Sequence, residues 1–330
     1  MKAVFSTLSP VEMAVLVAEP LIMVWYITAL LASIICPSPS SINLPRSAFP
    51  LVEMKLSLWL PISVLLQPVI SVYVLLPLYI YPYDDAGTFL WQPVIKAVAA
   101  HPHVQWQIII NPDSGPGSSK YPDSQYITAV SKLHKYSNVK MIGYVDTAYT
   151  RQKITEVQKQ ISLYAGWAKH TRENITLSGI FFDDVDDAAS AAPYMKTVSQ
   201  AARSAFPKSH GGSVTFNPGT NDSPISYYDY ADTVVNFESS LADYNNAKTI
   251  STFPPRHRPR EAIIANNGKP TAAALQTFVK QAISSSIGGI YITSDCCYQA
   301  VNATLLNAMV GDIATAQAQK SKRKLILWFA

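Results

Sequence analysis

Residues 177–187 read LSGIFFDDVDD. The first six residues are uncharged and mostly apolar, which is typical of a strand buried on both faces of a parallel sheet. Four carboxylates then occupy five positions. Crowded like charges repel and raise one another's pKa, so a surface loop gains little from them. We interpret Asp183 and Asp184, directly at the strand end, as functional, and Asp186 and Asp187 as a solvated acidic turn.

The same alternation of a short apolar run and a longer helical stretch recurs along the chain. Eight such units span about 245 residues, which predicts an α/β fold of the (β/α)8 TIM-barrel type, forming a single catalytic domain over residues 73–316. A doubly wound open sheet is the alternative, but the Tyr-Pro-Tyr-Asp-Asp turn at 81–85 is not a Gly-rich phosphate loop. The expected strands are 74–81, 104–111, 139–146, 177–183, 213–217, 233–238, 261–266 and 289–294.

The first 72 residues do not resemble a soluble domain. An uncharged, mostly apolar run occupies 20–36, and a second follows Met54 and Lys55. A single Lys, an apolar stretch and a small-residue end predict a secretory signal peptide at 54–72, which makes 1–53 an upstream extension or a mispredicted start. A retained membrane anchor and buried core segments are the alternatives. We expect the basic and apolar tail, 317–330, to be a solvated, disordered end.

The composition of the chain excludes several classes of function. The chain has 330 residues, 48% of them hydrophobic and 15% charged, with a net charge of +4. Four positive charges lie between Lys320 and Lys324, so the other residues are balanced and no basic face remains for a nucleic acid. Three Cys exclude a disulfide-dense scaffold. Of the two readings of the adjacent Cys296 and Cys297, a vicinal disulfide or two buried thiols, we favour the thiols.

Three N-glycosylation sequons, at Asn174, Asn221 and Asn302, agree with a secreted or cell-surface glycoprotein.

Polar residues follow the predicted strands, where the chemistry of a barrel collects. Tyrosines are frequent there (79, 81, 83, 144, 149, 227, 228, 230 and 298), and flat rings suit the C–H faces of sugars. The residues we expect to bind substrate are Tyr81, Asn111, Asp146, Asn217, Asn236, Asn266, Asp295 and Tyr298.

Glu238, two strands after Asp183, is the expected catalytic partner. Side chains that lean inward from strands about 10 Å apart can bring their carboxyl groups to about 5–6 Å. That separation suits a nucleophile and an acid/base flanking a glycosidic bond, whereas an inverting enzyme needs a wider gap. None of the six His ends a predicted strand, and we expect neither a metal site nor a cofactor.

Five segments together are similar to one known family. LLPLYIYP (75–82), GIFFDD (179–184), VTFNPGT (214–220), VVNFESS (234–240) and GGIYITSD (288–295) resemble the spherulin-4-like, or spherulation-specific family 4, proteins. The resemblance covers about 73–315. It implies a secreted or cell-surface (β/α)8 barrel with endo-glycosidase activity on α-1,4-linked N-acetylgalactosamine in galactosaminogalactan-type exopolysaccharide.

The resemblance also implies that the family's acidic pair falls on Asp183 and Asp184, and its glutamate on Glu238. The family pattern after FF is Asp-Glu, so this chain differs from the pattern at Asp184. The shorter side chain of Asp withdraws the second carboxyl group by about 1.5 Å, roughly one C–C bond. Misplacement on that scale can cost about a hundredfold in rate.

These observations predict a secreted, monomeric, retaining endo-glycosidase acting on an amino-sugar polymer. Asp183 is the expected nucleophile, Glu238 the acid/base and Asp184 a residue that orients Asp183 or binds sugar; the nucleophile and acid roles can also be exchanged. An acidic mouth would also attract free amines on the polymer. The alternatives are a non-catalytic polysaccharide-binding wall or spore-coat protein on the same barrel and, less favoured, a metal-dependent deacetylase.

Overall fold

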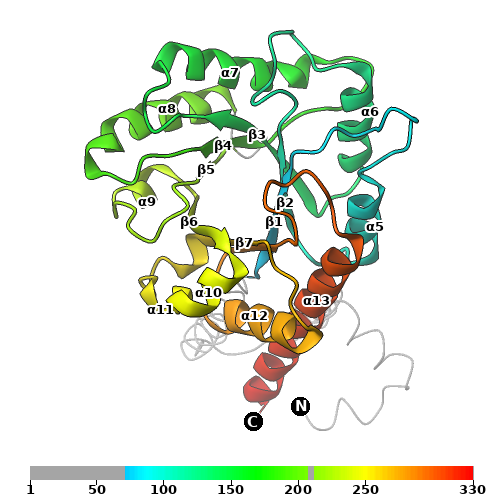
Figure 1. Ribbon diagram of the computed structural model, residues 1–330, viewed down its shortest axis with the longest axis vertical. Coiled ribbons are helices and arrows are strands. Elements are labelled where there is room, and N and C mark those ends of the chain that lie inside the picture. Colours follow the sequence, from blue (N-terminus) through cyan, green and yellow to red (C-terminus); the bar gives the residue numbers. More distant parts are fainter. Residues whose placement is uncertain (1–70, 207–211, 330) are drawn as a thin grey trace, which may run out of the picture. The chain divides into compact units, whose positions relative to one another are not determined.

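Eight parallel strands close into a barrel in the computed structural model, which describes residues 71–206 and 212–329 (Figure 1). Each strand pairs with its neighbours in chain order, and β8 returns to β1. The predicted fold class is therefore confirmed. The strands are β1 (Tyr73–Leu78), β2 (Trp106–Ile110), β3 (Val139–Asp146), β4 (Gly179–Asp183), β5 (Ser213–Phe216), β6 (Thr233–Ser240), β7 (Glu261–Asn266) and β8 (Gly289–Ile292).

Helices surround the strands. Several begin with the signals that the sequence carries: Asp123 and Thr271 accept hydrogen bonds from amides in the first turns of α6 and α12, and Pro193 lies in the first turn of α8. The helices are α5 (Gln92–Ala100), α6 (Ser124–Leu133), α7 (Ile154–Gly166), α8 (Ala192–Ala205), α9 (Tyr227–Tyr230), α10 (Leu241–Ala247), α11 (Thr249–Thr252), α12 (Ala272–Ser284) and α13 (Ala303–Phe329).

The connections around β6 are irregular. The connection from β5 to β6 holds only the four-residue α9, and the one from β6 to β7 holds α10, α11 and a 3-10 turn at Arg258–Arg260. These segments bring tyrosine and arginine side chains, rather than a long apolar helix face, against the barrel.

Polar side chains cross the barrel interior below its mouth. Gln107 of β2 donates a hydrogen bond to Ser213 of β5 at 3.1 Å, although these strands are not neighbours. The hydroxyl of Tyr73 in β1 likewise pairs with Thr233 in β6 at 2.8 Å. These four polar side chains therefore have hydrogen-bond partners inside the barrel.

The end of the chain differs from the expected disordered tail. α13 continues without interruption to Phe329. Gly311 is the only Gly or Pro in this helix, so nothing in the sequence of 317–329 stops it. Two side chains also attach the helix to the barrel: Gln317 donates to the carbonyl of Val72 at 2.7 Å and Lys320 to that of Ile283 at 3.1 Å.

The expected upstream extension and nearly all of the expected signal peptide, residues 1–70, lie outside the described residues. Within 71–206 and 212–329, no helix combines the length and the apolar character that crossing a bilayer requires.

Gly143 of β3 offers a test of the packing between strand and helix. A Cβ at this position would lie 2.6 Å from the ring of Tyr164 in α7, which is fully buried. We expect Gly143→Ala to destabilise the protein by about 1–3 kcal/mol through overpacking. Gly311→Ala is the matched control, since a Cβ there meets nothing within 4 Å, and it should stabilise α13 by up to about 1 kcal/mol. Equal midpoints of urea unfolding for the two variants would contradict this account.

Candidate active site

The ends of β4, β5 and β6 bring three polar residues together. Asp183 is the last residue of β4, and Asn217 directly follows β5. Asn217 is held by backbone hydrogen bonds to the fourth unit: its amide donates to Phe182, and its carbonyl accepts from Val185. Glu238 lies on β6, with its amide donating to the carbonyl of Gly219. Sequential strands of a closed barrel are neighbours, so these three residues meet at its mouth.

A β-bulge aims Glu238 inward. The register of β6 against β7 shifts between Val235 and Phe237, so Asn236 is an extra residue. Because side chains alternate between the faces of a strand, one extra residue reverses the alternation beyond it. Phe237 packs outside the barrel against Tyr244 of α10, while Glu238 faces Asn217. Without the bulge, Glu238 would face away from Asp183.

Asn217 joins the two carboxylates. Its Nδ2 donates to Oδ1 of Asp183 at 2.6 Å and to Oε2 of Glu238 at 2.5 Å. Because both bonds share one nitrogen, the two oxygens are at most 5.1 Å apart. Asn217 itself is buried, 6% exposed. The structure thus brings together Asp183, Asn217 and Glu238, three of the residues singled out from the sequence.

This arrangement raises the proton affinity of Asp183. Burial and, secondarily, the nearby charge of Glu238 raise the pKa of Asp183 to about 7, although hydrogen bonds from Tyr144 and Asn217 lower it. Asp183 therefore holds its proton to a much higher pH than an ordinary carboxyl group does.

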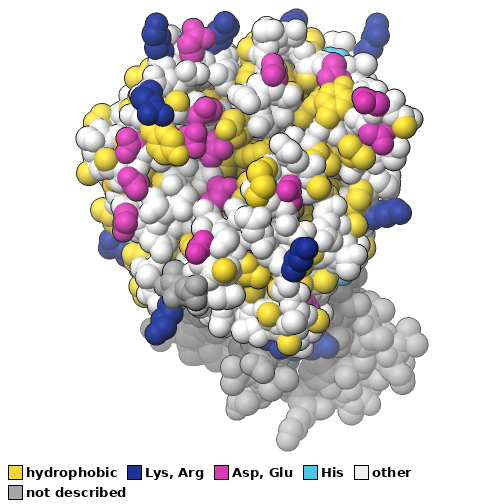
Figure 2. All heavy atoms as spheres, in the orientation of Figure 1, with side chains coloured by type: hydrophobic (Ala, Val, Ile, Leu, Met, Phe, Trp, Pro, Cys, Tyr) yellow, Lys and Arg dark blue, Asp and Glu magenta, His cyan; other side chains and the backbone are white. Residues whose placement is uncertain are grey.

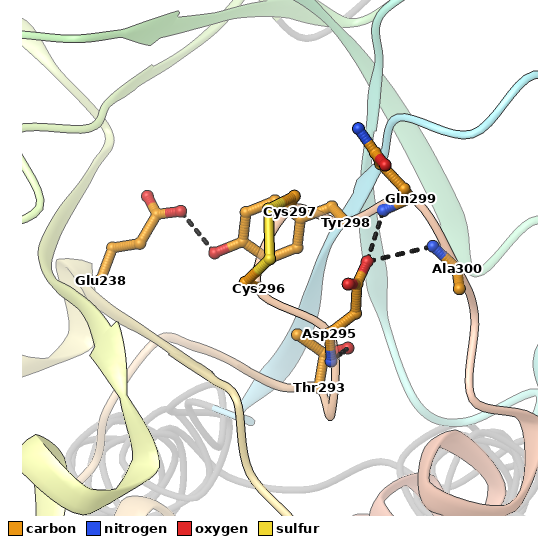
Figure 3. Close-up of a disulfide and its surroundings, with 8 residues drawn as sticks. All are labelled: Glu238, Thr293, Asp295, Cys296, Cys297, Tyr298, Gln299 and Ala300. Carbon is orange, nitrogen blue, oxygen red and sulfur yellow. Dashed lines mark hydrogen bonds between the residues drawn. A yellow bond between two sulfur atoms is a disulfide. The ribbon is translucent and has the colours of Figure 1, made fainter.

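Three tyrosines surround the pair. The ring of Tyr79 lies edge-on to Tyr144 and Tyr298, with centroids 5.4 and 5.6 Å away. Tyr144 hydrogen bonds to Asp183, and the hydroxyl of Tyr298 donates to Oε1 of Glu238 (Figure 3). Burial, and then the charges of Asp183 and Glu238, raise the pKa of Tyr79. The hydroxyls of Tyr144 and Tyr298 therefore serve as donors to the two carboxylates.

Asp184 points to a different group of residues. Its backbone is left-handed, at φ 46°, and its carboxyl group hydrogen bonds to Tyr149. Burial and the charge of Asp146 raise the pKa of Asp184, while Tyr149 and Arg151 lower it. Arg151 also lies over the ring of Tyr149, 5.5 Å from its centroid. Asp184, which directly follows β4, therefore contacts residues of the loop after β3 and lies at the edge of the central pair.

That loop is unusually bent. Three consecutive residues, Ala148, Tyr149 and Thr150, have left-handed backbones at φ 47°, 54° and 65°. Thr147 holds the turn against the end of β4, since its hydroxyl donates to the carbonyls of Asp183 and Asp184. Left-handed backbone costs energy in residues other than Gly and collects at functional sites. The turn presents Tyr149 to solvent, 48% exposed, beside Asp184.

Other predicted site residues have local structural partners. Asn111 accepts a hydrogen bond from the amide of Gly115, and Asp146 accepts one from the amide of Ala148. Tyr81 is 43% exposed and packs edge-on against Tyr126. Asn266 hydrogen bonds to Tyr298 and so touches the central group. Asp295 accepts from the amides of Gln299 and Ala300, which assigns its carboxylate to folding the loop after β8 (Figure 3).

Asn236, expected from the sequence to bind substrate, has its side chain directed to other protein groups. As the bulged residue it turns away from the mouth, and its Nδ2 donates to Tyr228 and to Oε2 of Glu261, at the first residue of β7. Sequence reasoning also missed Glu261, which is completely buried and has its pKa raised to about 7 by that burial. Its position at the start of a strand, at the opposite end from the mouth, separates it from the site.

The expectation of two buried thiols is also wrong. Cys296 and Cys297 form a disulfide, and both residues are exposed. They directly precede Tyr298, in the loop that folds around Asp295 (Figure 3).

Acidic side chains gather towards the centre of the face seen in Figure 2, while Lys and Arg side chains lie mostly towards its edge. Within 71–206 and 212–329, no group of three His, Cys, Asp or Glu is arranged to hold a metal ion.

The buried carboxyl groups predict how stability depends on pH. A folded-state pKa of about 7 for Asp183, above its ordinary 3.8, means that the folded state holds the proton more tightly. Stability should therefore fall as pH rises from about 4 to 7, and Glu261 contributes with the same sign. Melting temperatures of Asp183→Asn should fall less steeply over this range than those of the wild type. Glu261→Gln should flatten the slope in the same way, because Glu261 is a second buried carboxyl group with a raised pKa. An unchanged slope in Asp183→Asn would contradict the assignment.

Comparison with known proteins identifies the family of this chain. Residues 73–313 match the model of spherulation-specific family 4. Spherulin-4 of Physarum polycephalum is 36% identical over 172 residues, which are 52% of this chain but only 46% of that protein's length. The solved structure of Aspergillus clavatus Sph3 in complex with GalNAc is 29% identical with a TM-score of 0.65, covering 74% of this chain and 98% of that one. The chain therefore belongs to spherulation-specific family 4.

Proposed function

We propose that this protein is a secreted, retaining endo-glycosidase that cleaves α-1,4-linked N-acetylgalactosamine in a galactosaminogalactan-type exopolysaccharide. The observation that carries the proposal is the Asp183–Asn217–Glu238 bridge at the barrel mouth. The likeness to Sph3, whose structure contains GalNAc, supports the choice of sugar.

The spacing of the two carboxylates supports retention. Retaining glycosidases hold their carboxyl groups about 5–5.5 Å apart, whereas inverting enzymes keep them about 6.5–9.5 Å apart to admit a water. The facing oxygens of Asp183 and Glu238 are at most 5.1 Å apart. A gap of this size leaves no room for the attacking water that an inverting enzyme needs, so in this proposal the second carboxylate attacks the anomeric carbon directly.

The environments of the two groups favour Glu238 as the nucleophile and Asp183 as the acid/base. The sequence favours the opposite assignment and leaves this exchange open. Asp183 has a pKa raised to about 7 and can carry the proton that the leaving oxygen needs. Glu238 accepts one hydrogen bond on each oxygen, from Asn217 and Tyr298, which fixes the orientation of its carboxyl group for attack on the anomeric carbon.

The reaction then proceeds in two steps. Asp183 donates its proton to the glycosidic oxygen while Glu238 attacks the anomeric carbon, which leaves a glycosyl ester on Glu238. Asp183, now ionised, removes a proton from a water, and the resulting hydroxide displaces Glu238 from the sugar. Asn217 contacts both carboxylates throughout and keeps them at the required separation.

The surrounding tyrosines and Asp184 suit sugar binding. Tyr79, Tyr144 and Tyr298 place ring faces and hydroxyl groups around the pair. Asp184 and Tyr149 lie together at the edge of the mouth, where they can contact a neighbouring sugar of the polymer. In this arrangement the short side chain of Asp184 affects substrate binding rather than bond cleavage.

The first test is the release of reducing ends from purified galactosaminogalactan. Wild-type protein should cleave it, and Asp183→Asn and Glu238→Gln should each lose at least about a hundredfold in kcat. Asn217→Ala should lose on the order of a hundredfold because the carboxylates are no longer held at their separation. Glu261→Gln removes a buried carboxyl group outside the site and should keep wild-type activity.

A substrate with an activated aryl leaving group separates the two roles. Such a group departs without a proton, so Asp183→Asn should still release the phenol in a rapid burst, while Glu238→Gln should not. Wild-type protein that binds the polymer without cutting it would contradict the proposal and favour a polysaccharide-binding wall protein.

A further inference from the structure

The loop between β8 and α13 is a compact unit built around Asp295. The amide of Asp295 donates to the hydroxyl of Thr293, and its carboxylate accepts from the amides of Gln299 at 2.6 Å and Ala300 at 3.2 Å (Figure 3). At the far end of the loop, Asn302 donates to the hydroxyl of Ser294 at 3.0 Å. The segment from Asp295 to Ala300 is therefore closed back on itself.

The Cys296–Cys297 disulfide lies inside this closed segment. A disulfide between adjacent residues closes the shortest loop that a chain allows, so it removes little entropy from the unfolded state and does little for global stability. Its sulfurs are exposed rather than packed in the core. Its main physical effect is local: the covalent ring restricts the backbone immediately before Tyr298.

Tyr298 needs that restriction. Its backbone is left-handed, at φ 57°, a conformation that tyrosine seldom adopts unless its surroundings impose it. In this conformation the side chain turns from an exposed loop into the barrel mouth, where Tyr298 is 9% exposed. Its ring packs edge-on to Tyr79, and its hydroxyl donates to Glu238.

We propose that the Cys296–Cys297 disulfide is a positioning element for catalysis: together with the Asp295 turn, it holds Tyr298 so that its hydroxyl orients Glu238. The disulfide contacts neither reacting carboxylate and acts through Tyr298. This inference rests on the proposed glycosidase activity, and it adds that the activity depends on the oxidised form of the loop.

The test uses the full chain and three variants: Cys296→Ser/Cys297→Ser, Tyr298→Phe, and the triple combination. If the disulfide acts through Tyr298, the double-serine and Tyr298→Phe variants should each lose about tenfold or more in kcat with little change in KM. The triple variant should be no worse than Tyr298→Phe alone, because two changes in one pathway are not additive. Gln299→Ala, which alters an exposed side chain in the same loop, should keep wild-type kcat.

Reduction provides a second route to the same state. Dithiothreitol converts the disulfide to two thiols and is itself oxidised to a cyclic disulfide. It should lower wild-type kcat to that of the double-serine variant and leave that variant unchanged. Losses that add in the triple variant, or a double-serine variant with wild-type kcat, would overturn the inference.

A crystal structure of the double-serine variant keeps this inference separate from the proposed function. The inference predicts that the Tyr298 hydroxyl no longer lies within hydrogen-bonding distance of Glu238, whether or not the protein cuts its polymer. An unmoved Tyr298 would refute the inference, whereas an inert, oxidised wild type would refute the glycosidase proposal alone.

Discussion

One amide nitrogen, Nδ2 of Asn217, holds the centre of this structure together. Two carboxylates that approach to within 5.1 Å in a largely buried site repel each other unless a donor or a proton lies between them. Asn217 supplies the donor to both, and the raised pKa of Asp183 supplies the proton. Burial and, secondarily, the charge of Glu238 make Asp183 hold its proton more tightly than an ordinary carboxyl group does.

Several features of the barrel serve that arrangement. The bulge in β6 turns Glu238 inward, Tyr298 binds its second oxygen, and Tyr144 binds Asp183. The loops after β3 and β8 adopt left-handed backbone at Tyr149 and Tyr298, and each is tied down by hydrogen bonds to Asp or Thr side chains. The rigid strands therefore position the carboxylates, and the strained loops position the tyrosines around them.

The barrel and its central pair could be predicted because both follow from repeated, local patterns. Apolar runs that end in polar residues mark the ends of strands, and strand order in a barrel follows chain order. Asp183, Asn217 and Glu238 therefore lie close together at the carboxyl ends of β4, β5 and β6. The direction of the Asn236 side chain could not be predicted, because a bulge changes which face of the strand a residue occupies and leaves no sign in the sequence. The local role of the Asp295 carboxylate, which accepts from an amide of its own loop, was not apparent from the sequence either.

Other features depend on contacts that no local pattern reveals. Nothing in the sequence around Glu261 distinguishes it from an ordinary residue at the start of a strand. Its side chain is buried against Tyr228 and Asn236, which lie far from it in the sequence. Gln317 and Lys320 attach the helical end of the chain to backbone carbonyls of the barrel unit. Cys296 and Cys297 pair within the loop that folds around Asp295.

The most direct test of the account is the anomeric configuration of the first product, followed by proton NMR during cleavage of an N-acetylgalactosamine oligomer. A pair of carboxylates held at most 5.1 Å apart predicts that the α-anomer appears first and only later mutarotates. If the β-anomer appears first, water attacks directly and the bridge by Asn217 does not represent the catalytic geometry.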